Sequence, residues 1–291
     1  MLRTRLWMGV LLIVLAGLVL MVDQNLAPYY PFLFCLVLLL AQLACLELLH
    51  LLPPLRRPPA WLCHSAIAVL LILNWIPHME SAGNRFLPDP WFGIGVGLAM
   101  VVLVGFLEEM RSFRQAGEAV TRMATAFWIS GYLGLLPGFL VQLRWLEKAG
   151  PGSEATRENS ATIALALAIF VPKCCDIGAY FTGRFLGCHP MAPVLSPKKT
   201  WEGAAGGLGA AVLTAIGINR LGPVLSQGLW EEIGFGVTVG IAGMAGDLAE
   251  SLIKRDCGTK DASRVVPGFG GVLDVVDSIL FAAPIAYWWL R

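Results

Sequence analysis

The sequence predicts an all-α integral membrane protein that crosses the bilayer about nine times. Hydrophobic residues make up 57% of the 291 residues, whereas charged residues make up only 14%. The apolar residues also form continuous runs, long enough to cross a hydrocarbon core of about 30 Å as helices. A transmembrane β-barrel would instead show short segments of alternating polarity. These observations together favour a polytopic helical protein.

The apolar runs follow one another along the chain with no evident internal repeat. The first run, residues 5–22, follows Arg3 and Arg5, but it is long for a signal peptide and no clear cleavage site follows it. We therefore expect it to be retained as a span. The other eight expected spans cover residues 31–49, 61–76, 91–107, 123–142, 160–181, 203–220, 233–252 and 271–290.

The distribution of basic residues predicts the orientation of these spans. With the N-terminus in the cytoplasm, 14 of the 21 Lys and Arg residues fall on the cytoplasmic side and six on the other, and Lys173 lies within a span. Cytoplasmic segments carry an excess of Lys and Arg, so the sequence predicts a cytoplasmic N-terminus. In the first half of the chain, the charged residues between 108 and 122 are expected to form a solvated helical segment.

Composition also excludes several classes of protein. The formal net charge is +1 and no basic tract occurs, so we expect no nucleic-acid partner. The seven cysteines are odd in number and lack a Cys-x-x-Cys pair, which argues against a disulfide framework or a zinc site.

Charge is concentrated in one stretch, residues 246–278. From Asp247 to Asp277 the chain carries six acidic and four basic residues within 31 positions. Charge near membrane depth is costly unless it faces water, a metal or a charged substrate. This stretch is therefore the first candidate for a functional site, and we expect residues 151–291 to hold the catalytic region while residues 1–150 form a scaffold. Both belong to one continuous membrane domain.

Helical spacing groups the acidic side chains of this stretch. Asp247, Ser251 and Lys254 share a helix face if the span continues past residue 252. Asp274 and Asp277 are three residues apart, and two close carboxylates repel unless a cation joins them. Three convergent aspartates, Asp247, Asp274 and Asp277, suit Mg²⁺, which prefers oxygen ligands. The alternative is that the pair only favours a helix N-terminus while the basic residues mark the cytoplasmic side.

Other features of the second half of the chain are typical of phosphate-binding segments. Gly270 and Gly271 let the backbone approach a ligand closely just before a helix N-terminus. Residues 196–203 place hydroxyls and lysines in an expected turn before a helix, although a basic cytoplasmic flank would look similar. Asp176 and Tyr180 share a helix face, where a simple ion pair of Asp176 with Lys173 is the alternative. The candidate phosphate-binding residues of the 196–203 segment are Ser196, Lys198, Lys199 and Thr200.

Together these features indicate a polyphosphate, a divalent metal and a membrane-embedded substrate. The residues also resemble the signature of phosphatidate cytidylyltransferases, the CDP-diacylglycerol synthases. The similarity covers about the last 120 residues. It is carried by Ser251 to Arg255, Lys260–Asp261, Pro267–Gly268, Gly270–Gly271, Leu273–Asp274 and Asp277–Ser278, with weaker matches at 196–203 and around Asp176, Tyr180 and Gly183.

The resemblance implies transfer of CMP from CTP to phosphatidate in phospholipid biosynthesis, at the cytoplasmic face of a cell's inner membrane. Carried over by position, Asp247, Asp274 and Asp277 would bind the metal, and Lys254 would act beside them in catalysis. Mg²⁺, with a monovalent cation such as K⁺, would be the cofactor, and a homodimer remains an option. Signature residues near the phosphates would be Ser251, Lys254, Arg255, Lys260 and Asp261.

The chain departs from the family pattern at two positions. Phe269 stands where the family usually has His, and Val275 where it usually has Arg. The attacking phosphate oxygen is already ionised near neutral pH, so we do not expect an obligatory histidine base. The rival readings are a CTP-dependent kinase of a polyprenol-type lipid, a cation transporter with intramembrane aspartates, and a degenerate scaffold that keeps the fold without activity.

Overall fold

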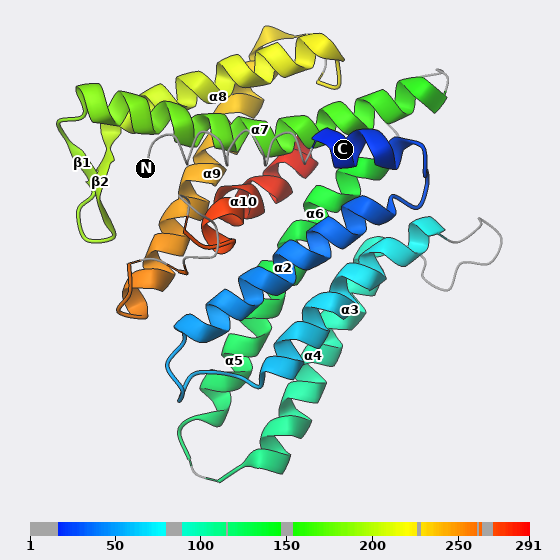
Figure 1. Ribbon diagram of the computed structural model, residues 1–291, viewed down its shortest axis with the longest axis vertical. Coiled ribbons are helices and arrows are strands. Elements are labelled where there is room, and N and C mark those ends of the chain that lie inside the picture. Colours follow the sequence, from blue (N-terminus) through cyan, green and yellow to red (C-terminus); the bar gives the residue numbers. More distant parts are fainter. Residues whose placement is uncertain are drawn as a thin grey trace. The chain divides into compact units, whose positions relative to one another are not determined.

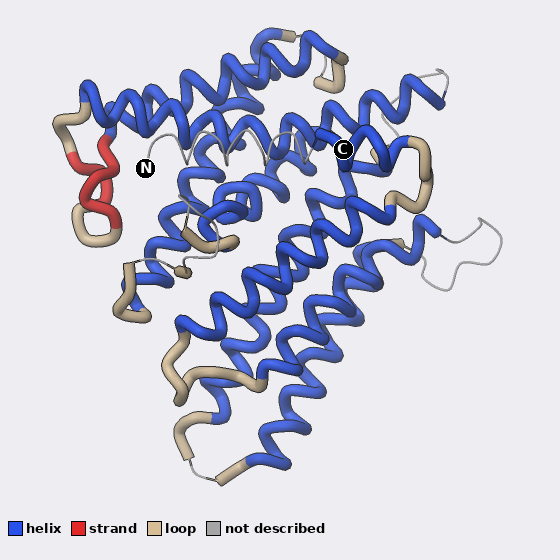
Figure 2. The backbone as a smooth tube through the Cα atoms, viewed as in Figure 1, coloured by secondary structure: helices blue, strands red, loops and turns tan. Residues whose placement is uncertain are grey.

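The computed structural model is dominated by long helices, with a single short hairpin among its described residues (Figure 2). It describes residues 17–79, 89–114, 116–146, 154–225, 228–260, 262–263 and 270–291. Eight helical segments in this part of the chain are long and apolar enough to cross a membrane. The predicted all-α polytopic fold is therefore confirmed, and the protein is a multi-pass membrane protein. The first expected span, 5–22, lies mostly outside the described residues.

Each of the other eight expected spans corresponds to helix. Most of the helices extend beyond the apolar run that predicted them, because polar residues continue the helix at one or both ends. The long helices are α2 (Pro31–Leu51), α3 (Ala60–Met79), α4 (Pro90–Ser112), α7 (Glu154–Leu186), α8 (Trp201–Leu221), α9 (Leu229–Asp256) and α10 (Leu273–Leu290). The remaining span combines α5 (Ala119–Ser130), the π-helix η1 (Gly131–Leu135), α6 (Leu136–Gln142) and the 3₁₀-helix η2 (Leu143–Trp145).

Local chemistry explains where several helices begin and end. Asp89 caps α4 by accepting from the N–H groups of Trp91 and Phe92, and proline fills the first helical position. At the end of α9, Gly258 adopts a φ of +70°. Its N–H donates to the Arg255 carbonyl and the Thr259 N–H donates to the Lys254 carbonyl, which is the Schellman arrangement. This motif stops α9 just after its last basic turn.

The chain divides into two compact units. The first contains residues 1–138 and 261–273, and the second contains residues 139–260 and 274–291. The division therefore falls before residue 150, and part of the charged stretch belongs with the N-terminal unit. Within the first unit, α3 packs against α2, α4, α5 and η1, and α4 packs against α5.

Within the second unit, α7 and α8 run side by side, and α9 packs against both (Figure 1). Glycines on α8 allow this close approach: a Cβ on Gly207 would lie 2.8 Å from the Cys175 carbonyl oxygen of α7, and one on Gly203 2.9 Å from that of Ala179. Small residues commonly allow such close contacts between membrane helices. Helices α7, α9 and α10 are unbroken along their lengths, even though Pro172 lies inside α7 and Pro284 inside α10.

A hairpin connects α7 to α8. Strands β1 (Pro190–Ala192) and β2 (Ser196–Thr200) pair antiparallel. The expectation of a simple turn at 196–200 was wrong, because this segment pairs with β1 as a strand. Thr200 then caps α8 by accepting from the Gly203 N–H at 3.1 Å. Glu202 fixes the base of the hairpin by accepting from the N–H groups of Cys188 and His189.

Candidate active site

The site is built where α9 and α10 approach each other closely at Gly246. A Cβ on Gly246 of α9 would lie 2.5 Å from the carbonyl oxygen of Asp277 on α10. Real Cβ atoms do not tolerate that distance, so the absence of a side chain at 246 is what lets the two backbones meet. As a result, the next residue, Asp247, lies beside the carboxylate of Asp277.

Three carboxylates converge at this crossing. Asp247, Glu250 and Asp277 each offer an oxygen, and the three oxygens lie within 4.8 Å of one another. Glu250 and Asp277 are only 1% and 4% exposed. Among the atoms that the structure describes, Oε1 of Glu250 is buried and has no hydrogen-bond partner. Such an acceptor is costly unless a cation or donor reaches it.

Three lysines surround these carboxylates. Lys254 donates to Glu250 at 2.8 Å and to Asp274 at 2.7 Å. Lys173, on α7, lies 3.2 Å from Asp277 and 3.7 Å from Asp176. Lys199, on β2, lies 2.7 Å from Asp247. We call the eight residues the acidic cluster: Lys173, Asp176, Lys199, Asp247, Glu250, Lys254, Asp274 and Asp277.

The acidic cluster is not electrically balanced. Its five carboxylates face three ammonium groups, so two formal negative charges remain among these eight residues. Buried carboxylates at such distances repel one another unless a cation joins them. An all-oxygen donor set and an excess of two negative charges fit a hard divalent cation such as Mg²⁺.

The structure rearranges the predicted metal-binding set. It brings Asp247 and Asp277 together, as expected, but their third partner is Glu250. Asp274 instead accepts from Lys254 at 2.7 Å. The reason is that Asp274 lies at the start of α10, where it faces the last turn of α9, whereas Glu250 lies one turn deeper beside Asp247. Ser251, expected to share a face with Asp247, is half-buried on α9.

The other predicted residues occupy several places around the cluster. Asp176 belongs to it through the ion pair with Lys173 at 3.7 Å, so the contact named in the alternative is present. Tyr180 accepts from Arg184 at 2.9 Å one turn further along α7. On the hairpin, Lys198 is exposed and Ser196 is half-buried.

The predicted residues around the loop between α9 and α10 lie less close together than the acidic cluster. Arg255 donates to the Leu195 carbonyl at 3.3 Å, which holds the hairpin near the end of α9. Lys260 is exposed just beyond α9, and Gly270 has a φ of +111°. Asp261 and Phe269 lie outside the described residues. Val275 is half-buried in the first turn of α10.

Sequence reasoning gave no site role to Glu250, Lys173 or Glu47. Glu250 follows Asp247 by three residues, a spacing that places both on one helix face. Lys173 is a single base inside an apolar run. Glu47 is a single acid inside α2, yet it is 3% exposed and accepts hydrogen bonds at the N-terminus of α10. An isolated charged residue within an apolar run is the signal that could have identified Lys173 and Glu47.

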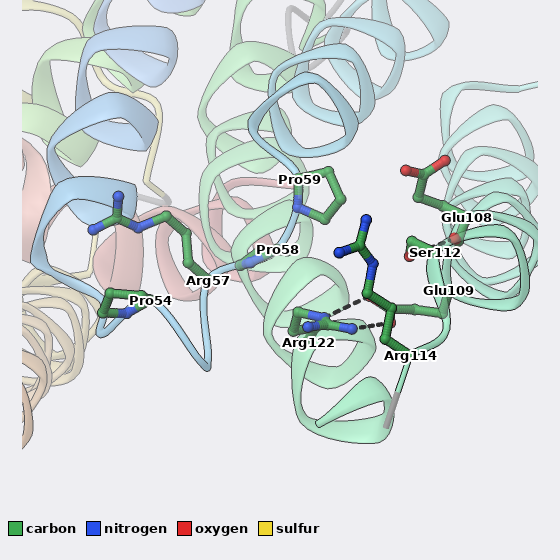
Figure 3. Close-up of a pocket in the computed structure, with 9 residues that line it drawn as sticks. All are labelled: Pro54, Arg57, Pro58, Pro59, Glu108, Glu109, Ser112, Arg114 and Arg122. Atoms are coloured by element: carbon green, nitrogen blue, oxygen red, sulfur yellow. Dashed lines mark hydrogen bonds and ion pairs between the residues drawn. The ribbon is translucent and has the colours of Figure 1, made fainter. Parts of the chain in front are cut away.

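A second group of charges lies in the first unit. It lines a hollow of about 420 Å³ near the loop that precedes α3 and the ends of α4 and α5 (Figure 3). Glu109, 6% exposed, receives two hydrogen bonds from Arg122, at 2.7 and 2.9 Å, so the expectation of a solvated segment was wrong at this residue. Arg57 donates to the backbone carbonyls of His50 and Leu52. We call the charged residues that line this hollow, together with Glu118, which pairs with Arg122 at 3.1 Å, the arginine–glutamate cluster: Arg57, Glu108, Glu109, Arg114, Glu118 and Arg122.

Fold and site together define a polytopic membrane protein with a partly buried, lysine-lined group of carboxylates. The model of the cytidylyltransferase family matches residues 2–291. The chain therefore belongs to the cytidylyltransferase family, whose members are nucleotidyltransferases.

Individual relatives are consistent with this assignment. A protein from Synechocystis sp. named phosphatidate cytidylyltransferase is 38% identical over 244 residues, which cover 77% of this chain and 78% of the relative. One of the same name from Mycobacterium tuberculosis is 30% identical over 256 residues, covering 70% and 75%. Another from Brucella suis is 46% identical over 112 residues, covering 38% and 41%.

Proposed function

We propose that this protein is a phosphatidate cytidylyltransferase, which transfers CMP from CTP to phosphatidate and releases pyrophosphate. The observation that carries the proposal is the acidic cluster. It combines an unbalanced set of buried carboxylates with lysines, in a chain that belongs to the cytidylyltransferase family. A reaction between two phosphates needs positive charge at the oxygens and little covalent chemistry from the protein.

Asp247, Glu250 and Asp277 would hold Mg²⁺, with Asp274 in support through Lys254. When bound, the ion would neutralise phosphate charge and act as a Lewis acid on the pyrophosphate leaving group. A monovalent cation such as K⁺ beside it is a further part of the proposal. The donor set fits Mg²⁺ because it consists of carboxylate oxygens with two unbalanced charges.

The basic residues would bind the phosphates of CTP and phosphatidate. Lys199 lies against Asp247 and Lys198 is exposed beside it, so the hairpin would carry two ammonium groups to the site. Arg255 and Lys260 extend the positive charge past the end of α9. Hydrogen bonds between charged groups and phosphate are about twice as strong as neutral ones, so each contact would contribute to orientation.

The chemistry needs no protein base. A phosphate oxygen of phosphatidate attacks the α-phosphorus of CTP, and the new O–P bond forms as the bond to the β-phosphate oxygen breaks. The electron pair leaves with pyrophosphate. Because the attacking oxygen is already ionised, no proton has to be removed. Replacement of the family's usual histidine by Phe269 is compatible with this step.

We propose further that the protein lies in a bacterial inner membrane with its N-terminus and site toward the cytoplasm. The distribution of Lys and Arg supports this orientation. CTP would reach the hairpin and the end of α9 from the cytoplasm, whereas phosphatidate would enter laterally from the bilayer. Cysteine labelling of single introduced cysteines in whole cells would test the orientation.

The deciding experiment uses purified full-length protein in lipid nanodiscs with phosphatidate, Mg²⁺ and CTP labelled in the α-phosphate. We expect labelled CDP-lipid together with pyrophosphate. The control is the double variant Asp274→Ala/Asp277→Ala, which should form no product. Activity equal to this control would refute the proposal, and release of CDP with phosphorylation of an added polyprenol would identify a kinase instead.

A further inference from the structure

Glu47 lies on α2, in the half of the chain predicted to be scaffold, and its side chain contacts residues more than 200 positions away. Its carboxylate accepts from the N–H of Val272 and the N–H of Leu273, both at 2.9 Å. It also accepts from the hydroxyl of Ser263 at 2.6 Å. These partners belong to the same compact unit as Glu47.

The contact supplies what the start of α10 lacks. The first N–H groups of a helix have no partner within the helix. Residues with a short polar side chain usually satisfy them, but the residue before α10 is Val272, whose side chain cannot accept a hydrogen bond. Glu47 takes this role from another helix, and its negative charge is favourable at the positive end of the α10 dipole. Three donors also offset the cost of burying this carboxylate.

The absence of a side chain at Gly271 leaves room for the same contact. A Cβ at this position would lie 2.5 Å from Oε2 of Glu47 and 2.9 Å from its Cδ. Any other residue would push the carboxylate away from the α10 N-terminus. The glycine that sequence reasoning assigned to substrate binding thus accommodates a protein carboxylate, which is independent support for a specific role of Glu47.

The helix that Glu47 caps carries two of the site's acids. Asp274 is the second residue of α10 and Asp277 the fifth, so Asp277 lies about 6 Å along the helix axis from the capped residue Leu273. A helix start that frays or shifts would move both carboxylates. Catalytic groups need placement to within about 0.5 Å, so the cap bears directly on the reaction.

We propose that Glu47 is a positioning residue, which fixes the first turn of α10 and thereby sets the positions of Asp274 and Asp277. The inference rests on the proposed function for its kinetic consequence, whereas its structural consequence can be measured without activity. Glu47 does not touch the reacting groups itself. Its removal should therefore loosen the metal site rather than delete a ligand.

The test compares Glu47→Gln with wild type in nanodiscs by hydrogen exchange and by Mg²⁺ titration of CMP transfer. The glutamine keeps the size, but its amide nitrogen cannot accept from a backbone N–H. We expect amide exchange in residues 272–275 to accelerate about tenfold or more. We also expect the half-saturating Mg²⁺ concentration to rise about tenfold, with activity partly restored at high Mg²⁺.

The matched control is Gln42→Leu on the same helix. Gln42 donates to the His64 carbonyl at 3.0 Å, so its replacement also removes a polar contact of α2. This control should leave exchange at 272–275 and the Mg²⁺ requirement unaltered. If Glu47→Gln cannot be purified, Ser263→Ala takes its place in the test, because it removes one of the three donors to Glu47. It should shift amide exchange and the Mg²⁺ requirement in the same direction by a smaller factor.

The outcomes separate the two proposals. The role of Glu47 would be overturned if Glu47→Gln matched Gln42→Leu in amide exchange and in Mg²⁺ dependence. Where Ser263→Ala has to replace Glu47→Gln, wild-type values of both readouts in Ser263→Ala would overturn it. A wild-type protein that transfers no CMP would refute the proposed function, while the exchange measurement would still decide whether Glu47 caps α10.

Discussion

The two charged clusters of this protein are built from similar residues but differ in balance. The arginine–glutamate cluster of the first unit contains three glutamates and three arginines, and Arg122 donates two hydrogen bonds to Glu109 and pairs with Glu118. In the acidic cluster of the second unit, five carboxylates face three lysines, and one buried oxygen of Glu250 lacks a partner among the described residues. Positive and negative side chains are equal in number in the first cluster, whereas among the eight residues of the second the carboxylates outnumber the lysines by two.

This difference separates a structural role from a chemical one. A balanced, bidentate pair fixes helices α4 and α5 and leaves no charge for a ligand. An unbalanced, partly buried cluster costs stability unless a cation compensates it, and charged residues in such positions mark sites of binding or catalysis. Six substitutions, arranged in four comparisons, test whether the distinction holds.

The largest effect is expected from Asp277→Asn in the acidic cluster. The substitution keeps the shape but removes a carboxylate that faces Lys173 and both other members of the converging trio. We expect CMP transfer to fall about 1,000-fold, the scale found when a group that stabilises transition-state charge is removed. Labelled CDP-lipid formed in nanodiscs is the measurement. A loss of less than tenfold would place the reaction elsewhere in the molecule.

Glu250→Gln and Asp274→Asn compare the observed trio with the one that spacing predicted. Because Glu250 converges with Asp247 and Asp277 while Asp274 is paired with Lys254, we expect Glu250→Gln to have the larger effect. The half-saturating Mg²⁺ concentration should rise about 10- to 100-fold for Glu250→Gln and less for Asp274→Asn. The reverse order would restore Asp274 as the third ligand.

Lys199→Met and Lys198→Met distinguish the two hairpin lysines. Lys199 contacts Asp247, whereas Lys198 is exposed. We expect kcat/KM for CTP to fall about tenfold in Lys199→Met, the value of one hydrogen bond to a charged group, and by a smaller factor in Lys198→Met. Initial rates over a range of CTP concentrations measure this. Equal losses would show that the hairpin acts only through its overall charge.

The smallest effect on activity is expected from Glu109→Gln in the balanced cluster. The substitution removes the charge that holds Arg122, so the free energy of unfolding should fall by about 1–3 kcal/mol. Activity per folded molecule should stay at the wild-type level. Thermal unfolding in detergent and CMP transfer in nanodiscs report the two quantities. A large loss of activity without loss of stability would show that the arginine–glutamate cluster also has a chemical role, and would contradict the distinction between the two clusters.

The sequence predicted the membrane helices well because their signal is the length of an apolar run. Residues 31–49, for example, predicted α2 to within two residues at each end. The end of α9 was harder, since the helix continues through a basic turn and stops only at the motif around Gly258. The strand at Ser196–Thr200 was missed because its partner β1 has only three residues and no alternation of polarity.

The site was predicted only in part because spacing along one helix does not determine contacts between helices. The 3.6-residue period grouped Asp247 with residues further along α9, but it did not select Glu250 over Asp274 as the third member of the group. That selection depends on the α9–α10 crossing at Gly246. Glu47 was missed for a similar reason, since no local rule connects α2 to a helix start 226 residues later.

That separation has a consequence for how the protein is made. When α2 leaves the ribosome, the N–H groups that will donate to the Glu47 carboxylate have not been synthesised. At about 5–20 residues per second, the 226 intervening residues require about 10–45 s. During that time α2 enters the bilayer with an acidic side chain whose final partners are missing. Helix α10, synthesised long after α2, therefore completes the environment of an acidic side chain on α2.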